Sequence, residues 1–161
     1  MERIARWFLA TVLLCCTSMA TAGTSDTSPL VGRWALDVSK LQMPAEARPK
    51  SVTMEFRDAG GGTWTSRVVI VHPGGEEMSA ETSLPLDGRP GPISGNYWAD
   101  VSAVKMPASN VLVMQLADDG KPASTRIYSV GEDRRTMTET KAIFGEDGTP
   151  ILQTNTFIRL P

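Results

Sequence analysis

Three tight reversals of one pattern divide the second half of the chain into short segments. Each places an Asp-Gly pair ahead of a proline, in the ranges 87–90, 119–122 and 147–150. An Asp-Gly pair tolerates the positive φ of a tight turn, and a proline cannot donate a hydrogen bond to a sheet. We therefore expect strands joined by short turns, and each strand that follows such a proline should begin at an unpaired or bulged residue. Further reversals are expected at 60–62 and 73–75.

Between the reversals, apolar residues alternate with polar ones, as in a strand with one buried face. In 51–57, for example, Val52, Met54 and Phe56 fall on one side and polar residues on the other. No stretch after residue 30 keeps a helical period for more than two turns, and the best helix candidate is one turn at 44–47. The pattern predicts about nine strands, in the ranges 33–38, 51–57, 63–72, 77–86, 98–106, 110–118, 123–130, 134–143 and 150–160.

An open antiparallel sheet of this size would leave edges that invite aggregation, so the strands should close into a barrel or stack as two sheets. Aromatic residues are only 6% of the sequence. An interior lined by Val, Met, Ala and Thr fits a barrel with a partly unfilled centre. We favour an all-β fold, an antiparallel up-and-down β-barrel of about eight or nine strands, with a two-sheet sandwich as the alternative.

The first 22 residues have the three parts of a secretory signal peptide. A positively charged start is followed by an apolar run at 7–16 and by Ala-Thr-Ala at 20–22. The apolar run is well short of the ~20 residues that a membrane-spanning helix needs. We expect an exported protein, periplasmic or extracellular, whose mature chain has no membrane span, with a signal peptide at 1–22, a polar leader at 23–29 and one domain at 30–161.

The charge balance argues against a nucleic-acid partner. The formal net charge is −2, from 16 basic and 18 acidic residues, with no run of like charge. Such a chain has no positively charged surface for gripping a phosphate backbone. We expect a monomer whose partner, if it has one, is a small molecule.

Few residues are available for catalysis or metal binding. Cys15 and Cys16 lie in the signal peptide, and His72 is the single histidine, placed at a reversal. A zinc or copper site usually needs several such ligands, and nucleophilic catalysis needs a base held against a serine or cysteine. We expect no catalytic residue, no metal and no cofactor. The acidic pairs fall at expected turns, where carboxylates cap backbone amides, in the ranges 76–77, 118–119, 132–133 and 146–147.

The start of the domain carries a family resemblance. Val31-Gly32-Arg33-Trp34 opens the first expected strand with Gly-x-Trp, and the chain continues to Ser39 with Asp37 where asparagine is commoner. This opening resembles that of secreted bacterial lipocalin-like proteins. The resemblance implies an up-and-down barrel with Gly32 and Trp34 at one end. It also implies that an arginine of the last strand, here Arg159, packs over the tryptophan as a cation–π contact.

The function that remains is binding, and the apolar members of alternating strands would face a ligand inside the barrel. The same residues, tightly packed, would form an ordinary core. A second hypothesis is a solid-core module that binds a protein or glycan through its loops, with Tyr97 or Trp98 as the exposed anchor. An enzyme would need carboxylates that converge inside the barrel. The residues expected to face the ligand are Met54, Phe56, Trp64, Val68, Leu112, Met114, Leu116 and Tyr128, with Met137 and Phe157 as weaker candidates.

Overall fold

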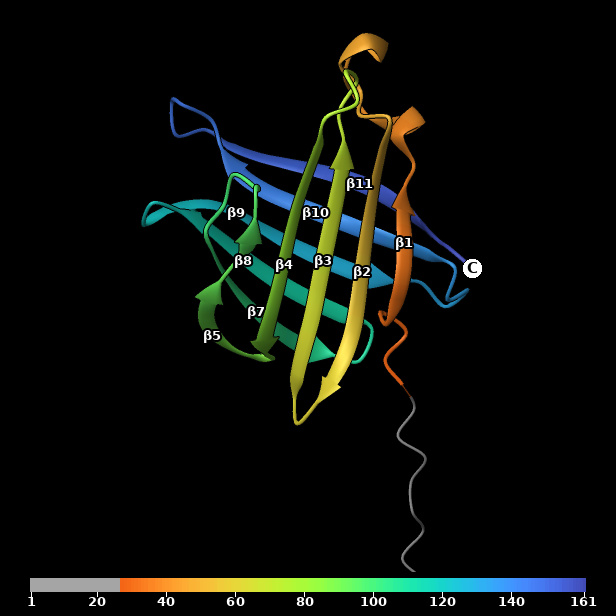
Figure 1. Ribbon diagram of the computed structural model, residues 1–161, viewed down its shortest axis with the longest axis vertical. Helices are drawn as coiled ribbons and strands as arrows, with labels where there is room; N and C mark the ends of the chain where they lie inside the picture. The colour runs from red at the N-terminus through yellow and green to blue at the C-terminus, as the bar shows by residue number, and fades with distance from the viewer. Residues whose placement is uncertain (1–26) are drawn as a thin grey trace, which may run out of the picture.

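A single antiparallel sheet of eleven strands curls into a nearly closed barrel (Figure 1). The computed structural model describes residues 27–161, so the expected signal peptide and residues 23–26 of the leader lie outside the described residues. In Figure 1, β2, β3 and β4 cross in front of the later strands, which run obliquely behind them. The strands are β1 (Gly32–Leu36), β2 (Ser51–Gly60), β3 (Thr63–Val71), β4 (Glu77–Pro85), β5 (Asp87–Pro92), β6 (Ser94–Gly95), β7 (Val101–Ala108), β8 (Val111–Asp118), β9 (Lys121–Val130), β10 (Thr136–Phe144) and β11 (Pro150–Arg159).

The two ends of the sheet belong to neighbouring parts of the chain. The strand order is β5-β7-β8-β9-β10-β11-β1-β2-β3-β4-β6, so the first and last strands of the domain pair with each other in its middle. β5 pairs with β7 and β6 pairs with β4, and only Ile93 separates β5 from β6. The segment 87–95 therefore runs from one sheet edge to the other and covers the remaining gap in the wall.

The sequence-based expectation of eight or nine strands was too low. The two additional strands, β5 and β6, lie in the segment 87–95, where a reversal was expected at 87–90 and no strand before residue 98. Pro90 and Pro92 are compatible with β5 because it is an edge strand, paired on one side only, where a missing N–H costs no ladder bond. The first strand is also shorter than expected, since β1 ends at Leu36 and Val38 begins a 3₁₀ turn.

Two 3₁₀ turns lie in the connection between β1 and β2. They are η1 (Val38–Lys40) and η2 (Ala45–Ala47), and the second confirms the single helical turn expected at 44–47. Among the described residues, no helix is long and apolar enough to cross a membrane. The predominance of strands expected from the alternation is confirmed in residues 27–161.

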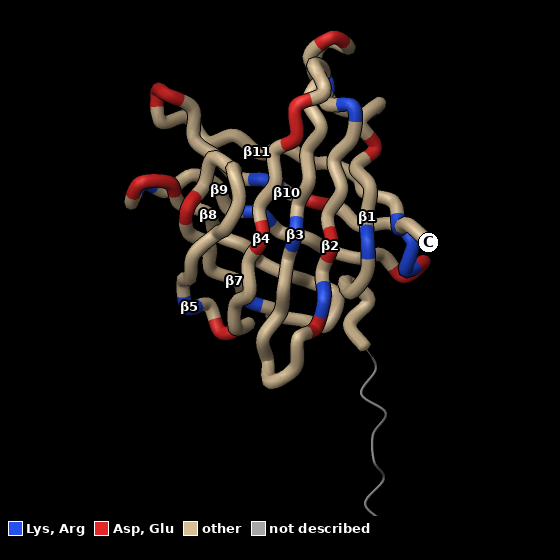
Figure 2. The backbone as a smooth tube through the Cα atoms, in the orientation of Figure 1, with Lys and Arg blue, Asp and Glu red and all other residues tan. Residues whose placement is uncertain are grey.

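All three Asp-Gly reversals place their glycine at a positive φ, as the turn chemistry predicts. Asp119 and Gly120 have φ values of 47° and 72°, and they join β8 to β9. Pro122 follows, and the pairing register shifts opposite it between Leu116 and Ala117, which confirms the expected bulge at this turn. Pro150 instead pairs in regular register with Phe144, so the expected unpaired or bulged residue is wrong at the third turn. Acidic residues mark the ends of several hairpins in Figure 2. At the β10–β11 turn, for instance, the Asp147 carboxylate accepts a hydrogen bond from the Thr149 amide at 2.9 Å.

The core fills the end of the barrel near Trp34 and Phe56. Both side chains are fully buried, as is Tyr128, whose ring meets that of Phe56 edge-on with centroids 5.4 Å apart. Alternation is kept along most strands, so that Leu112, for example, is buried while its neighbours on β8 are partly exposed. The interior toward the other end is less completely filled and contains polar groups.

Candidate functional site

Two strands place charged side chains inside the barrel. On β9, Arg126 has the same parity as Ser124 and Tyr128, both of which are buried, whereas Ile127 is 39% exposed. On β10, Glu139 follows the buried Met137 by two residues, and it is buried itself. The period of two along each strand therefore turns the guanidinium and the carboxylate toward the same interior.

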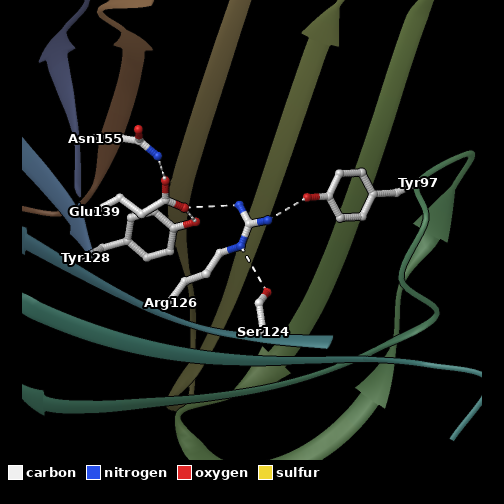
Figure 3. A network of polar contacts seen from close by, with 6 residues as sticks. All are labelled: Tyr97, Ser124, Arg126, Tyr128, Glu139 and Asn155. Atoms are coloured by element: carbon white, nitrogen blue, oxygen red, sulfur yellow. Dashed lines mark hydrogen bonds and ion pairs between the residues drawn. The ribbon is translucent and has the colours of Figure 1, made fainter. Parts of the chain in front are cut away.

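Glu139 is the acceptor at the centre of the polar network in Figure 3. Its Oε1 accepts hydrogen bonds from Arg126 Nη1 and from the Tyr128 hydroxyl, each at 3.0 Å. Its Oε2 accepts a third from Asn155 Nδ2 at 2.7 Å. Three donors, two from β9 and one from β11, satisfy this buried carboxylate, which would be costly to bury alone.

Arg126 extends the network toward the gap in the barrel wall. Its Nη2 donates to the Tyr97 hydroxyl at 3.1 Å, and its Nε donates to Ser124 Oγ at 3.4 Å. The side chains of the ion pair are 15% exposed for Arg126 and 4% for Glu139. Contacts with Glu139, Ser124 and Tyr97 thus fix the guanidinium in orientation.

The network changes the acidity of its members. Burial alone would lower the pKa of Arg126, but the hydroxyls of Tyr128 and Tyr97 and the Glu139 carboxylate outweigh it, and the pKa is raised. Burial raises the pKa of Tyr128 well above its ordinary value, and Glu139 raises it further. At neutral pH the site therefore holds a charged guanidinium among neutral phenols.

The segment 93–98, called the strap below, carries Tyr97 over the gap between β4 and β7. The amide N–H and side chain of Asn96 hold the strap to β4: N donates to Ser79 O at 3.1 Å, and Nδ2 donates to Glu77 O at 3.0 Å. Gly95 has a φ of 118° and lies so close to Ser79 that a Cβ would collide with its carbonyl oxygen. The sequence thus specifies a strap seated tightly on the edge of β4.

The two aromatic residues of the strap point in different directions. Tyr97 is half-buried and turns its hydroxyl inward to Arg126, whereas Trp98 is 41% exposed. Their ring centroids lie 4.9 Å apart, and the Arg126 guanidinium carbon lies 5.8 Å from the Trp98 ring. Tyr97 is part of the inner-pocket wall described below, whereas Trp98 is not.

Beneath the strap is a hollow, called the inner pocket. Its volume is about 30 Å³, room for roughly two water molecules. Four polar residues of its wall, called the polar corner, are Tyr97, Arg126, Ser66 and Thr82. The hydroxyls of Ser66 and Thr82 form a hydrogen bond with each other at 2.7 Å. The rest of the wall is apolar and consists of Met54, Val68, Ala80, Ile93, Met114, Leu116 and the buried Tyr128.

A larger hollow, called the side hollow, lies where β11 extends beyond its pairing with β1. Its volume is about 370 Å³. It lies between residues 40–43, in the connection from β1 to β2, and four residues of β11, Leu152, Gln153, Thr154 and Asn155. Asn155 also bonds Glu139. The polar network therefore runs from the wall of the inner pocket at Tyr97 to the wall of the side hollow at Asn155.

The expected ligand-facing residues divide into two groups. Met54, Val68, Met114, Leu116 and Tyr128 line the inner pocket. The other three, Phe56, Trp64 and Leu112, surround a void of only about 10 Å³ and form part of the packed core. The weaker candidates Met137 and Phe157 are also buried in the core.

Arg126, Glu139 and Asn155 were not among the residues expected at the site. A signal was available, because Arg126 shares strand parity with Tyr128, and Glu139 shares it with Met137. The search for alternating apolar residues does not use this shared parity, because a charged residue at an inward position interrupts the alternation. Only the pairing of β9 with β10, which brings the two charges together, shows that they satisfy each other.

At the barrel end, Arg159 lies over Trp34. The guanidinium carbon is 4.1 Å from the centre of the indole ring, and the indole Nε1 donates to Leu30 O at 2.9 Å. Gly32, with a φ of 131°, leaves room for the arginine, since a Cβ there would lie 2.5 Å from Arg159 Nη1. The residues of the Gly-x-Trp opening and the last strand meet as that resemblance implies for the family.

Other chemically capable residues lie apart from the network. His72 is at the reversal between β3 and β4, partly exposed, with its amide donating to Glu76 O at 2.9 Å. Within residues 27–161, no three His, Cys, Asp or Glu side chains gather in a group that could hold a metal ion. On the inward faces of β9, β10 and β11, Glu139 is the one carboxylate.

Comparison with known proteins gives a fold and no family. No protein-family model matches the sequence. No curated protein matches it either. Among solved structures, a fatty acid binding protein of Schistosoma mansoni in complex with arachidonic acid is similar, with a TM-score of 0.55, 16% identity, and coverage of 84% of this chain and 98% of that one. The wild-type fluorescent protein UnaG has a TM-score of 0.51, 15% identity, and coverage of 81% and 96%.

The nearly closed barrel of this chain thus has a fold similar to that of the fatty acid binding protein and UnaG. At these identities the likeness concerns the arrangement of strands and assigns no ligand.

Proposed function

We propose that this protein binds a small, largely apolar molecule inside its barrel and does not transform it chemically. The observation that carries the proposal is the inner pocket, whose methionine and aliphatic wall ends in one ordered polar corner. Small-molecule sites commonly combine a mostly apolar wall with a few placed polar groups. The fatty acid binding protein, solved with arachidonic acid, supports the idea that a barrel of this type can hold such a ligand.

The size of the inner pocket defines what binding requires. With room for about two waters, it accepts a longer ligand only if side chains move. Met54 and Met114 are suited to this, because methionine is unbranched and adapts to irregular shapes. The ligand would displace these two side chains and enter past the strap or from the side hollow.

We further propose that the chain acts after export, as a lipocalin-like protein. The support is in the sequence, with a charged start, a short apolar run and Ala-Thr-Ala at 20–22, together with the Gly-x-Trp opening at Gly32 and Trp34. Mass spectrometry of the protein secreted or released by its own host tests this directly. A mature N-terminus at Gly23 is expected, and an intact N-terminus in the cytoplasmic fraction would contradict it.

Binding is tested by calorimetric titration with decan-1-ol, a simple apolar molecule with one polar end. The test variant is Ala80→Met, which adds bulk to the wall of the inner pocket. The matched control is Ala103→Met on β7, which has outward parity because Ser102 and Val104 are buried. We expect saturable binding that A80M weakens at least tenfold and A103M leaves unchanged. No binding to the wild type, or equal loss in both variants, would contradict the proposal.

The loop-binding alternative rests on the exposed face of Trp98. An indole that is 41% exposed can anchor a protein or a glycan. Trp98→Ala should then abolish capture of the partner while the melting temperature is unchanged. In the ligand-binding proposal, the same variant leaves ligand affinity unchanged, because Trp98 is not part of the inner-pocket wall.

A further inference from the structure

Lys141 lies on the inner wall between the two hollows. It continues the inward parity of Met137 and Glu139 along β10, and it is only partly exposed. In the antiparallel pairing it is directly opposite Arg126 on β9 and Gln153 on β11. Arg126 lines the inner pocket and Gln153 lines the side hollow, so Lys141 lies in the sheet between a residue of one hollow and a residue of the other.

The charges in this region do not balance. Arg126 is paired with Glu139 at 3.0 Å. Among residues 27–161 no carboxylate oxygen lies within the 4.0 Å of Lys141 Nζ that would make an ion pair. The inward faces of β9 and β10 therefore present two cationic side chains and one anionic side chain. A partly buried ammonium without a counter-ion favours an anion beside it.

The acidity of Lys141 agrees with this placement. Burial lowers its pKa, the nearby Arg126 lowers it further, and Glu139 offsets part of the change. The charges of Arg126 and Glu139 therefore both act on the Lys141 ammonium, and neither residue forms an ion pair with it. A carboxylate of a bound ligand would remove this imbalance.

Arg126 is less available than Lys141 to bind an incoming anion. Its hydrogen bonds already go to Glu139, Tyr97 and Ser124. A carboxylate added to this guanidinium would lie beside the Glu139 carboxylate, and like charges at such a distance repel. Lys141 has three rotatable N–H donors on a flexible stem and can reach toward either hollow.

We propose that Lys141 binds the carboxylate of an amphiphilic ligand whose apolar part lies inside the barrel. This inference rests on the proposed binding function and narrows its ligand class to molecules with an acidic end. Arg126 and Glu139 then act as a fixed pair that supports the wall, with Glu139 limiting direct contact between the ligand and the arginine.

The test compares decanoic acid with decan-1-ol, which have the same chain and differ in the charge of the head group. Both are titrated calorimetrically at neutral pH and below their micelle concentrations. Lys141→Met and Lys141→Gln remove the ammonium in two ways, so that the result does not depend on the folding of one variant. Lys141→Arg keeps the charge, and Lys105→Met removes an exposed lysine from the outward face of β7.

For the wild type we expect tighter binding of the acid than of the alcohol by about tenfold, the effect of one charge-assisted hydrogen bond. K141M and K141Q should abolish that preference while alcohol binding stays within about twofold. K141R and K105M should keep it.

An undiminished preference for the acid in both K141M and K141Q would overturn the assignment of Lys141. An equal loss for acid and alcohol would do the same, because it would indicate a general effect on the pocket. A wild type that binds the alcohol and the acid equally would overturn the acidic ligand class but leave the binding function standing. A wild type that binds neither would overturn the binding function itself.

Discussion

Arg159 covers the ring of Trp34 at 4.1 Å and connects the last strand to the segment that precedes the first. Its Nε donates to Arg134 O at 2.7 Å and its Nη1 to Val31 O at 2.9 Å, while Nη2 donates to Pro29 O. One guanidinium thus joins the chain before β1, the turn before β10 and the end of β11 over the buried indole. The contact between Arg159 and Trp34 closes the end of the barrel at which β1 begins.

Arg159→Ala should lower the free energy of unfolding by about 2 kcal/mol, because the cation–π contact and charge-assisted hydrogen bonds are lost together. Arg159→Lys should recover only part of that stability, since an ammonium cannot fork to several carbonyl groups. Urea unfolding measures both. Arg57→Ala, at an exposed ion pair with Glu55, is the control, with an expected change below about 1 kcal/mol.

Gly32→Ala should destabilise the same barrel end by about 1–3 kcal/mol. The backbone φ of 131° disfavours any L side chain, and the new Cβ would lie 2.5 Å from Arg159 Nη1. Gly120→Ala is an informative comparison, since Gly120 also has a positive φ but a Cβ there meets nothing within 4 Å. If the two variants lost equal stability in urea, the collision with Arg159 would contribute nothing.

Glu139→Ala should lower the free energy of unfolding by about 3–5 kcal/mol, because it leaves Arg126 as an uncompensated charge in the interior. Replacing both partners, as Arg126→Met with Glu139→Leu, should be milder than the single change despite altering more atoms. Urea unfolding of Arg126→Met, of Glu139→Leu and of the double variant gives the coupling between the two residues. Additive losses would show that the pair is not energetically linked.

Stability should fall as the pH rises above about 10, the ordinary pKa of tyrosine. The folded state raises the pKa of Tyr128, so the unfolded chain loses the phenolic proton first and is favoured at high pH. Lys141 acts in the opposite direction because its pKa is lowered. Tyr128→Phe should therefore reduce the loss of stability between about pH 9 and pH 11. An identical loss in wild type and Y128F would contradict this assignment.

Gly95→Ala should accelerate both entry and release of decan-1-ol, because the added Cβ would push the strap away from Ser79 on β4. Stopped-flow fluorescence measures the two rates. Gly61→Ala, in the β2–β3 turn with open space around it, controls for the loss of a positive-φ glycine. Unchanged rates in G95A would indicate that the ligand enters elsewhere, with the side hollow as the other route.

The parts of the fold that follow from local sequence were predictable. Asp119 and Gly120 specify a tight turn by themselves, and the alternation of Val52, Met54 and Phe56 fixes which face of β2 is buried. β5 and β6 could not be found in this way. Their residues, rich in Gly and Pro, become strands only because β7 and β4 offer edges for them to pair with.

In the candidate site too, some residues follow from local sequence and others depend on how the strands pair. Apolar members of the inner pocket such as Met54 and Met114 followed from alternation alone. The pairing of Arg126 with Glu139, and the position of Lys141 between the hollows, depend on the register between β9, β10 and β11. Register is a property of the whole sheet, so a reading of one strand at a time places each charge at an inward position without showing its partner.

The most direct test of ligand binding inside the barrel is a crystal structure of the protein grown with decan-1-ol. The account predicts continuous density for the alkyl chain between Met54 and Met114, with both side chains displaced and the hydroxyl in the polar corner near Tyr97 and Arg126. An inner pocket that keeps its present side-chain positions, with the alcohol absent or bound on the outer surface, would contradict it.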